Sequence, residues 1–347
     1  MKSVSIIGHF AQGRVVLNGQ TIKTKIIADQ LENIYGKENV RRIDTADGWR
    51  FLLRLPFSAF YWLCISKNII MLPAHNGVRI IPLVLVVATL LFHRRLFYVV
   101  IGGWLPEHTR RNVMLRWILR RLNRIFPESL SMKIALEEQG FQNITIMPNT
   151  KPLDIANIKS LPDDTRTPLS ACTFSRVMRE KGIEEAVEAV IACNKKTNRV
   201  SVTLDIYGQI ESGEEQWFES LKKTFPDFVR YQGAVGYQET NKILCQYNAL
   251  LFPTFYDGEC FAGTFLDAFA AGLPVIASDW HDNANIVKHG YTGFIFPVHS
   301  VKALTLQLID IVNNPTSLSI LRENCLKEAL KYKPENIVKT LVSHFTP

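Results

Sequence analysis

The sequence predicts an α/β fold with doubly wound parallel sheets, and three observations lead to it. Short apolar segments alternate with amphipathic helical patterns along nearly the whole chain. The connections between them are short, which in α/β proteins places helices on both faces of a parallel sheet. The pattern starts afresh at Ala171, after a polar, proline-bearing stretch at 151–168. The 347 residues, 47% of them apolar, are therefore interpreted as two domains with a cleft between them.

In the front half, apolar segments bounded by turn residues predict strands, and a 3.6-residue period predicts helices over 20–35 and 129–139. The longest apolar run, 80–92, has 13 residues. A bilayer span needs about 20, so we expect a buried helix there. The predicted strands are 4–7, 40–44, 68–72, 96–101, 124–126 and 144–147.

The back half repeats the alternation. We expect residues 1–150 to form one Rossmann-like domain, 151–330 a second, and 331–347 a helix that packs back on the first. The predicted strands are 171–174, 202–207, 229–231, 249–253, 275–277 and 293–296, separated by helices at 183–194, 214–224, 238–247, 264–271 and 301–312.

Charge divides unevenly between the halves. Residues 1–150 hold 20 Lys and Arg against 9 Asp and Glu, while the remainder hold 20 against 23. Six arginines interleave with apolar residues, including Trp117, over 109–126, and 49–65 is aromatic-rich. Such segments suit docking on an anionic membrane surface. Core helices with solvated arginine faces would have the same sequence pattern. Nucleic acid is not expected, because no nucleic-acid-binding motif accompanies the charge.

Cysteine usage and the N-terminus indicate a cytoplasmic protein. The six cysteines form no C-x-x-C pair and no metal-ligand spacing, which favours reduced thiols. The first residues lack the long apolar run of a signal peptide. We expect a cytoplasmic chain, peripheral at most on the inner face of the membrane.

The loop at 175–182 directly follows a predicted strand and carries Arg176 and Lys181. Ligands of parallel α/β sheets bind at the carboxyl ends of strands, beside helix N-termini. Two cations there can hold a diphosphate. An exposed basic turn is the plainer alternative.

The stretch 252–278 runs from a strand through a polar loop bearing Glu259 into an apolar helix that contains Asp267. An acid in the first turns of a helix is often only a partner of the helix dipole. Asp267, however, lies in an otherwise apolar stretch, where an ionised carboxylate needs a partner. A pair of ligand hydroxyls would supply one.

Together these two loops resemble the donor site of the GT-B retaining glycosyltransferases of family 4. Arg176 and Lys181-Gly182 match that family's basic turn, and Glu259 and Asp267 stand at the spacing of its E-x₇-E motif. The likeness extends over residues 172–296, including Ile206-Tyr207-Gly208 and the turn at 290–294. Further matches are Pro253, Phe261, Gly263, Ala268, Ala270, Gly272, Pro274 and Val275.

The resemblance implies a hexosyltransferase that uses a nucleotide-diphosphate sugar. Arg176 and Lys181 would neutralise the leaving diphosphate, Glu259 would orient the sugar, and Asp267 would hold the ribose hydroxyls. Two departures, Asp267 where the family has Glu and Asn285 where it often has Glu, leave a non-catalytic sugar-nucleotide-binding partner as the alternative. Other donor-binding residues implied by the likeness are Gly19, Gly208, Phe261, Ala262 and Gly263.

The front half resembles the family more weakly, as acceptor domains do. Gly19 and Gln20 resemble the Gly-rich loop before the first helix, and His75 and Trp104 follow predicted strands. Trp104 could stack on an acceptor sugar or simply cap the sheet edge. The acceptor-side residues are taken as Gln20, His75, Gly102, Gly103 and Trp104.

The sequences of these front-half segments further resemble those of family members that build bacterial surface polysaccharide, such as capsule, exopolysaccharide or O-antigen. The expected acceptor is therefore a glycan or a lipid-linked glycan. No D-x-D carboxylate pair occurs in the chain, so we expect neither an obligatory metal nor a cofactor. A nucleotide-sugar epimerase is disfavoured by the motif at 253–275, and a dinucleotide oxidoreductase by the lack of G-x-G-x-x-G after the first strand.

Overall fold

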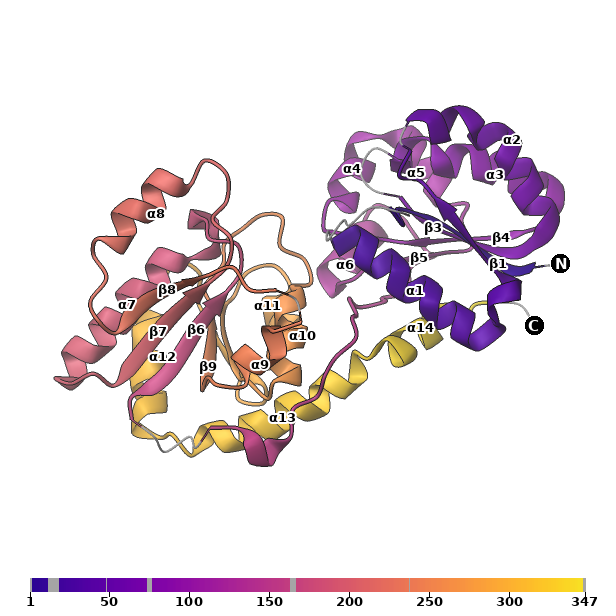
Figure 1. Ribbon diagram of the computed structural model, residues 1–347. Helices are drawn as coiled ribbons and strands as arrows, with labels where there is room; N and C mark the ends of the chain where they lie inside the picture. The colour runs from indigo at the N-terminus through magenta and orange to yellow at the C-terminus, as the bar shows by residue number, and fades with distance from the viewer. Residues whose placement is uncertain are drawn as a thin grey trace. The chain divides into compact units, whose positions relative to one another are not determined.

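The computed structural model describes residues 2–11, 19–47, 49–73, 77–162, 167–236 and 238–345. The chain forms two compact units: Met1–Pro152 with Tyr332–Pro347, the N-terminal unit, and Leu153–Lys331, the C-terminal unit. Each contains one sheet in which every pairing is parallel, with helices on both faces (Figure 1). The predicted α/β class with two Rossmann-like, doubly wound domains is confirmed.

The N-terminal unit has a five-stranded sheet in the order β2-β1-β3-β4-β5. Its strands are β1 (Lys2–Gly8), β2 (Val40–Asp44), β3 (Ser66–Leu72), β4 (Arg95–Val99) and β5 (Arg124–Phe126). Its helices are α1 (Gly19–Tyr35), α2 (Trp49–Ile65), α3 (Ile81–Phe92), α4 (Leu105–Arg111), α5 (Val113–Leu119), α6 (Leu130–Glu137) and α14 (Pro334–Val342), with 3-10 turns at Lys37–Asn39 and Gly77–Arg79.

The C-terminal unit has a six-stranded sheet in the order β11-β10-β9-β6-β7-β8. Its strands are β6 (Leu169–Phe174), β7 (Val202–Tyr207), β8 (Val229–Gly233), β9 (Ala249–Phe252), β10 (Val275–Ser278) and β11 (Gly293–Phe296). Its helices are α7 (Ile183–Thr197), α8 (Glu215–Lys222), α9 (Thr240–Leu244), α10 (Gly263–Ala270), α11 (Asn283–Ile286), α12 (Val301–Asn313) and α13 (Ser317–Lys331), with 3-10 turns at Ile158–Ser160 and Arg179–Lys181.

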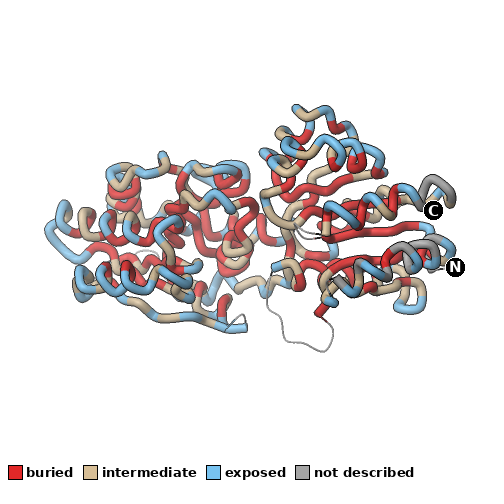
Figure 2. The backbone as a smooth tube through the Cα atoms, turned by 90° about the horizontal axis from the view of Figure 1, so that it is seen from above, coloured by how far each residue is buried: buried red, intermediate tan, exposed pale blue. Residues whose placement is uncertain are grey.

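Buried residues concentrate in the strands and on the inner faces of the helices (Figure 2). In the C-terminal unit the core joins α7 and α12 to one face of the sheet, with Val190 and Leu308 both fully buried. In the N-terminal unit the core joins α1 and α14 to β1, β3 and β4. Apolar burial of this kind stabilises by about 25 cal/mol per Å² removed from water.

The last segment of the chain belongs to the N-terminal unit. α14 packs beside α1 and buries Val338 and Leu341 completely. Beyond it, the Phe345 ring lies 5.2 Å from the Phe97 ring. Thr150 donates a hydrogen bond of 2.6 Å to the Tyr332 carbonyl, so the returning chain is tied in where it enters the unit.

Two expectations for the front half are corrected. Residues 144–147 form no strand; Ile144 makes a single bridge to Ile125. The Met147 amide bonds instead to the carbonyl of Pro127, so the segment leaves the edge of the sheet after one pairing. The helix at 80–92 exists as α3 but is not wholly buried, because Val87 is 57% exposed.

The strand order of the C-terminal sheet indicates at which edge of the sheet a ligand would bind. β6 and β9 are neighbours, and the chain winds outward from them in both directions. Open α/β sheets bind ligands at this topological switch point, outside the carboxyl ends of the strands. The loops that follow β6 and β9 carry Arg176, Lys181 and Glu259.

Candidate donor site

The loop after β6 is held against the end of β9 by a glycine. A turn of 3-10 helix, Arg179–Lys181, leads through Gly182 into α7. Gly182 has a φ of 71°, and a Cβ there would lie 2.1 Å from the Pro253 carbonyl oxygen. A side chain would force the two loops apart, so the close approach depends on glycine.

A nearly buried ion pair joins the two loops. Lys181 Nζ donates to Glu259 Oε2, and the two side chains are 8% and 10% exposed. The Thr254 hydroxyl lies 3.3 Å from the same carboxylate oxygen. Because either charge would be costly to leave unpaired at this depth, the pair acts as one fixed unit.

The ring of Tyr256 lies against both cations of the site. The Arg176 Cζ is 5.4 Å and the Lys181 Nζ 4.7 Å from its centroid, within cation–π range. The Tyr256 backbone is fixed as well, since its carbonyl accepts a 2.9 Å hydrogen bond from the Trp280 indole. Tyr256 and Trp280 were not predicted as site residues, although Tyr256 lies within the stretch 252–278 and Trp280 directly follows it.

Arg176 has a carboxylate partner on the neighbouring loop. Its Nη1 donates to Glu211 Oε2 at 2.7 Å. Burial alone would lower the pKa of Arg176, but hydrogen bonds with Tyr256 and Glu211 outweigh it and raise that pKa, so the guanidinium stays charged. Glu211 was missed from the sequence. The available signal was an acid in the loop after β7, which neighbours β6 in a parallel sheet.

The predicted residues of the next helix lie at its first turns. Phe261 and Ala262 are buried just before α10, and Gly263 is its first residue. The Thr264 hydroxyl donates to the Phe174 carbonyl at 3.1 Å, which ties the start of α10 to the end of β6. Asp267 is half-buried on α10, at the spacing of one helical turn from Gly263.

Gly208 shapes the site without offering a side chain. Its φ is 144°, and a Cβ there would lie 1.7 Å from the Ser175 carbonyl oxygen. The loop after β7 can therefore pack on the loop that carries Arg176. Asn285 stands where the related family often has Glu. It donates a hydrogen bond of 3.0 Å to the Asp282 carboxylate at the start of α11.

The predicted acceptor-side residues all belong to the N-terminal unit. Gln20 donates a 3.3 Å hydrogen bond to the Leu72 carbonyl, so α1 is tied to the end of β3, while Gly19 begins that helix. The Trp104 indole donates 2.9 Å to the Ile101 carbonyl across Gly102, whose φ is 81°. Gly103 is exposed between them, and His75 lies outside the described residues.

A buried ion pair near these residues was not predicted. Lys23 on α1 donates to Glu128 and, at 3.2 Å, to the Val100 carbonyl. Both side chains are almost fully buried. Since Val100 and Glu128 follow β4 and β5, the pair fixes α1 to the carboxyl edge of the sheet. A lysine inside an apolar helical pattern was the signal for it.

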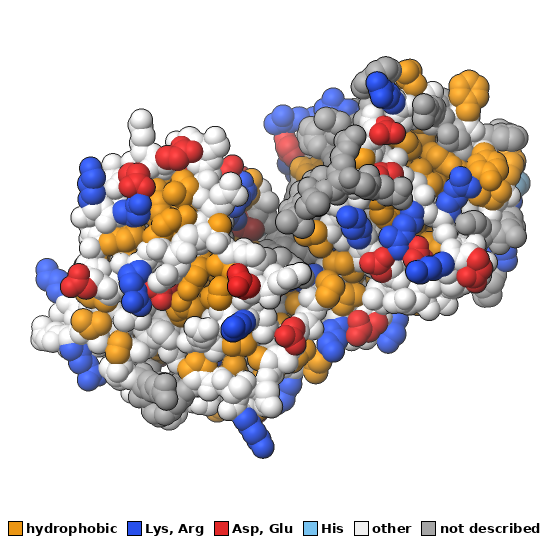
Figure 3. Space-filling model, viewed as in Figure 1, with side chains coloured by type: hydrophobic (Ala, Val, Ile, Leu, Met, Phe, Trp, Pro, Cys, Tyr) orange, Lys and Arg blue, Asp and Glu red, His pale blue; other side chains and the backbone are white. Residues whose placement is uncertain are grey.

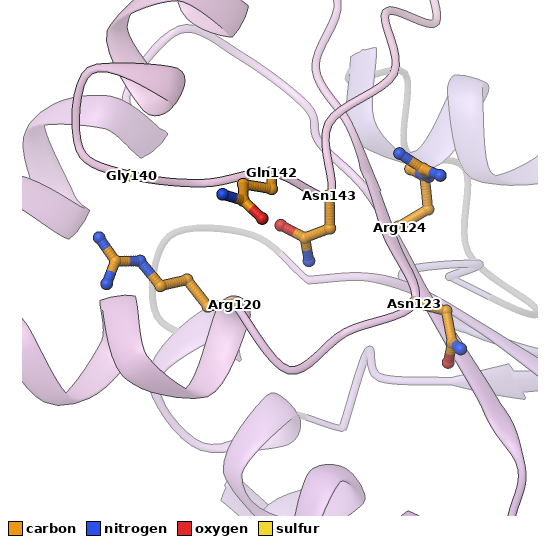
Figure 4. Close-up of a pocket in the computed structure, with 6 residues that line it drawn as sticks. All are labelled: Arg120, Asn123, Arg124, Gly140, Gln142 and Asn143. Carbon is orange, nitrogen blue, oxygen red and sulfur yellow. The ribbon is translucent and has the colours of Figure 1, made fainter.

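A cavity of about 400 Å³ opens at the other end of the same sheet. Figure 4 shows that its polar side chains do not converge on a common point. Arg120 is already engaged, since it donates to the Gln139 carbonyl and lies 5.6 Å from the Phe141 ring. The cavity is lined by Asn123 and by Arg124, the first residue of β5, and so lies away from the carboxyl edge.

Within the described ranges, no helix is both long and apolar enough to cross a bilayer. The same residues contain no group of three or more His, Cys, Asp and Glu side chains placed to hold a metal ion.

Comparison with solved structures defines the fold class. HepE of Anabaena in complex with UDP aligns over 99% of both chains with a TM-score of 0.73 and 15% identity. The lipopolysaccharide outer core galactosyltransferase WaaB aligns over 99% of both chains, also at 0.73, with 16% identity. The fold of the chain is that of the GT-B glycosyltransferases.

Sequence comparison defines the family of the C-terminal unit. Residues 169–314 match the family model described as glycosyl transferases group 1. The GtfA subunit of UDP-N-acetylglucosamine–peptide N-acetylglucosaminyltransferase from Streptococcus pneumoniae is 29% identical over 171 residues, 48% of this chain and 32% of that protein. The amylovoran biosynthesis glycosyltransferase AmsK of Erwinia amylovora is 26% identical over 162 residues, 44% of this chain and 38% of that one.

The chain thus spans about a third of the length of the GtfA relative. Residues 169–314 are a group 1 glycosyl transferase domain, which confirms the resemblance found in the sequence.

Proposed function

We propose that this protein transfers a hexose from a nucleotide-diphosphate sugar to a glycan or lipid-linked glycan. The observation that carries the proposal is the cluster at the switch point of the C-terminal sheet, where Arg176, Lys181 and Glu259 meet around Tyr256. Solved neighbours of the same fold hold UDP, and HepE has been solved with UDP-glucose. Two fixed cations beside the N-terminus of α10 suit a diphosphate.

In the proposed mechanism the charge that develops on the leaving diphosphate is met by Arg176 and Lys181. Donors fixed before the reaction need no reorganisation in the transition state, which is where such stabilisation counts most. Glu259 orients the sugar hydroxyls, and Asp267 accepts hydrogen bonds from the ribose. Transfer proceeds with retention, and the departing phosphate oxygen takes the proton of the acceptor hydroxyl on the same face of the sugar.

The assay is transfer of labelled sugar by the full chain and its variants. Arg176→Ala and Glu259→Ala should each lower turnover by at least about 100-fold, the scale of losing one transition-state donor. Arg179→Ala is the matched control, because Arg179 is a neighbouring loop cation that pairs with Glu214 instead. Unchanged turnover in either test variant would contradict the site. Transfer above background by the wild type excludes a purely non-catalytic binding partner.

Two finer features of the proposal have their own readouts. Retention is tested by NMR of the first-formed product, whose anomeric configuration should match that of the donor. We also propose that no divalent metal is obligatory, so chelation should leave turnover unchanged. Inversion of the anomeric configuration would contradict retention, and loss of activity with chelator would contradict metal independence. Neither result would contradict the assignment of the donor site.

We further propose that the N-terminal unit docks on the anionic inner face of the cell membrane, where a surface polysaccharide is assembled. On α2, Phe57 is 84% exposed, and on α5 Trp117 is 54% exposed. α3 contacts both helices and exposes Val87. Figure 3 shows hydrophobic side chains beside Lys and Arg on this part of the surface. Exposed aromatic and cationic groups together favour an anionic bilayer.

Flotation with liposomes of anionic or neutral lipid tests the docking. The wild type should float with anionic vesicles, and Phe57→Ser with Trp117→Ser should reduce the bound fraction several-fold. Ile320→Ser is the control, because Ile320 is 67% exposed on α13 of the C-terminal unit. Absence of wild-type binding to either lipid would refute the proposal.

A further inference from the structure

We propose that Glu211 is an internal competitor that occupies Arg176 when no donor is bound and weakens the binding of every diphosphate ligand of the site. The inference rests on the proposed function, since it concerns the same nucleotide-diphosphate pocket. It assigns a role in binding and product release to a residue outside the motifs of that pocket.

The Arg176–Glu211 pair is positioned by the backbone. Val177 N donates to the Gln209 carbonyl at 2.8 Å, and Glu211 N donates to the Val177 carbonyl at 3.0 Å. These bonds form a parallel bridge between the two loops, in addition to the close approach at Gly208. The backbone bridge therefore places Glu211 within hydrogen-bonding reach of the guanidinium.

The two cations of the site differ in how firmly their partners hold them. Lys181 and Glu259 are nearly buried, whereas Arg176 and Glu211 are 47% and 35% exposed. An exposed pair is solvated and weak, so an incoming anion can displace its carboxylate. Of the two cations, Arg176 therefore has the partner that an incoming anion displaces more easily.

A diphosphate that binds Arg176 must approach the Glu211 carboxylate or move it. Both groups are anionic, and Glu211 already accepts a hydrogen bond of 2.7 Å from Nη1, which carries two of the five N–H donors of the guanidinium. Glu211 therefore raises the dissociation constant of donor and product alike. When the nucleoside diphosphate product leaves, Glu211 reoccupies Arg176, which shortens the lifetime of the product complex.

The full chain is first titrated by calorimetry with a panel of UDP, GDP, ADP and dTDP to find the diphosphate that binds. That diphosphate is then titrated into the wild type and the variants. Glu211→Gln keeps the size of the side chain and removes its charge. It should bind the diphosphate about two- to fivefold more tightly, the range expected from an exposed ion pair. In assays of transfer, the inhibition constant of that product should fall by the same factor.

Three controls isolate the competition. Glu214→Gln makes the same change in net charge at a carboxylate that pairs with Arg179 at 3.4 Å, and it should leave the affinity unchanged. In an Arg176→Ala background, Glu211→Gln should have no effect, because the contested cation is gone. The parent nucleoside, which has no phosphate, should bind wild type and Glu211→Gln equally.

Equal or weaker diphosphate binding by Glu211→Gln overturns the inference, as does an equal gain in Glu214→Gln. Either result leaves the proposed function intact, because the wild type has bound the ligand. If the wild type binds no member of the panel, the proposed function fails and the inference fails with it.

Discussion

Gly208 sits where a side chain would collide with the backbone of the Arg176 loop. Alanine there combines a φ of 144° with a Cβ 1.7 Å from the Ser175 carbonyl oxygen. We expect Gly208→Ala to lower the free energy of unfolding by at least about 2 kcal/mol. Thermal or urea unfolding measures it.

Gly213 provides the comparison for that substitution. Its φ is 92°, but a Cβ there would meet nothing within 4 Å. Gly213→Ala should therefore cost only about 1 kcal/mol of backbone strain. Equal losses in the two variants would show that the loop contact at Gly208 is unimportant.

His344 should make the stability of the N-terminal unit fall as the pH is lowered. Burial, and then the charges of Arg124 and Arg95, lower its pKa from the usual 6.5. The unfolded chain therefore binds more protons between the folded pKa and about pH 6.5, and stability falls as pH drops through that window. The unfolding midpoint should fall more from pH 7.5 to 5.5 in wild type than in His344→Gln. The same fall in both would contradict the assignment.

The sequence alone supports part of the site at this scale. Arg176, Lys181, Glu259 and Asp267 were predicted as site residues because each stands in a loop or helix with a local pattern. Glu211 and Tyr256 were missed because their roles arise from contacts between loops. The Arg176–Glu211 pair spans 35 residues, and no local spacing encodes it.

At the scale of elements, α14 is the segment that depends most on the rest of its unit. Leu341 is fully buried against α1 and the sheet. Leu341→Ala should lower stability by about 2–5 kcal/mol, because it removes a buried side chain and leaves a cavity. The measurement is unfolding of the full chain. Leu306→Ala, at a position 50% exposed on α12, should change it by less than about 1 kcal/mol.

Most elements were predictable from apolar periodicity, and the exceptions have physical causes. Residues 144–147 have the composition of a strand, but the backbone turns to bond Pro127 and pairing stops after Ile144. α3 reads as a buried helix because it is apolar all round. Burial depends on what covers each face, which the periodicity of one segment does not contain.

At the scale of the whole molecule, the two units carry separate cores. Residues 153–331 contain the complete six-stranded sheet and all the predicted donor-site residues except Gly19, which begins α1 in the N-terminal unit. We expect this segment alone to fold cooperatively and to bind the same nucleoside diphosphate as the full chain, within about tenfold in affinity. Circular dichroism and calorimetry test both statements. A segment that folds but does not bind would place essential donor contacts in the N-terminal unit.

The structure also shows on which elements the unevenly distributed charges of the sequence lie. In the C-terminal unit, Arg176 and Lys181 of one loop each pair with one carboxylate, whereas the basic excess of the front half includes the arginines of α4 and α5. Composition separated the halves, but it could not place Trp117 or Phe57 on the surface. That placement needed the packing of α2, α3 and α5.

In the proposed donor complex, Arg176 and Lys181 hold the diphosphate of a nucleotide sugar. Calorimetric titration of the full chain with a panel of nucleotide-diphosphate sugars tests it most directly. At least one sugar nucleotide should bind with a dissociation constant between about 1 μM and 1 mM, the usual range for enzyme substrates. Arg176→Ala should weaken it at least about tenfold, while Arg179→Ala leaves it unchanged. Binding that Arg176→Ala does not alter, or no binding at all, would contradict the account.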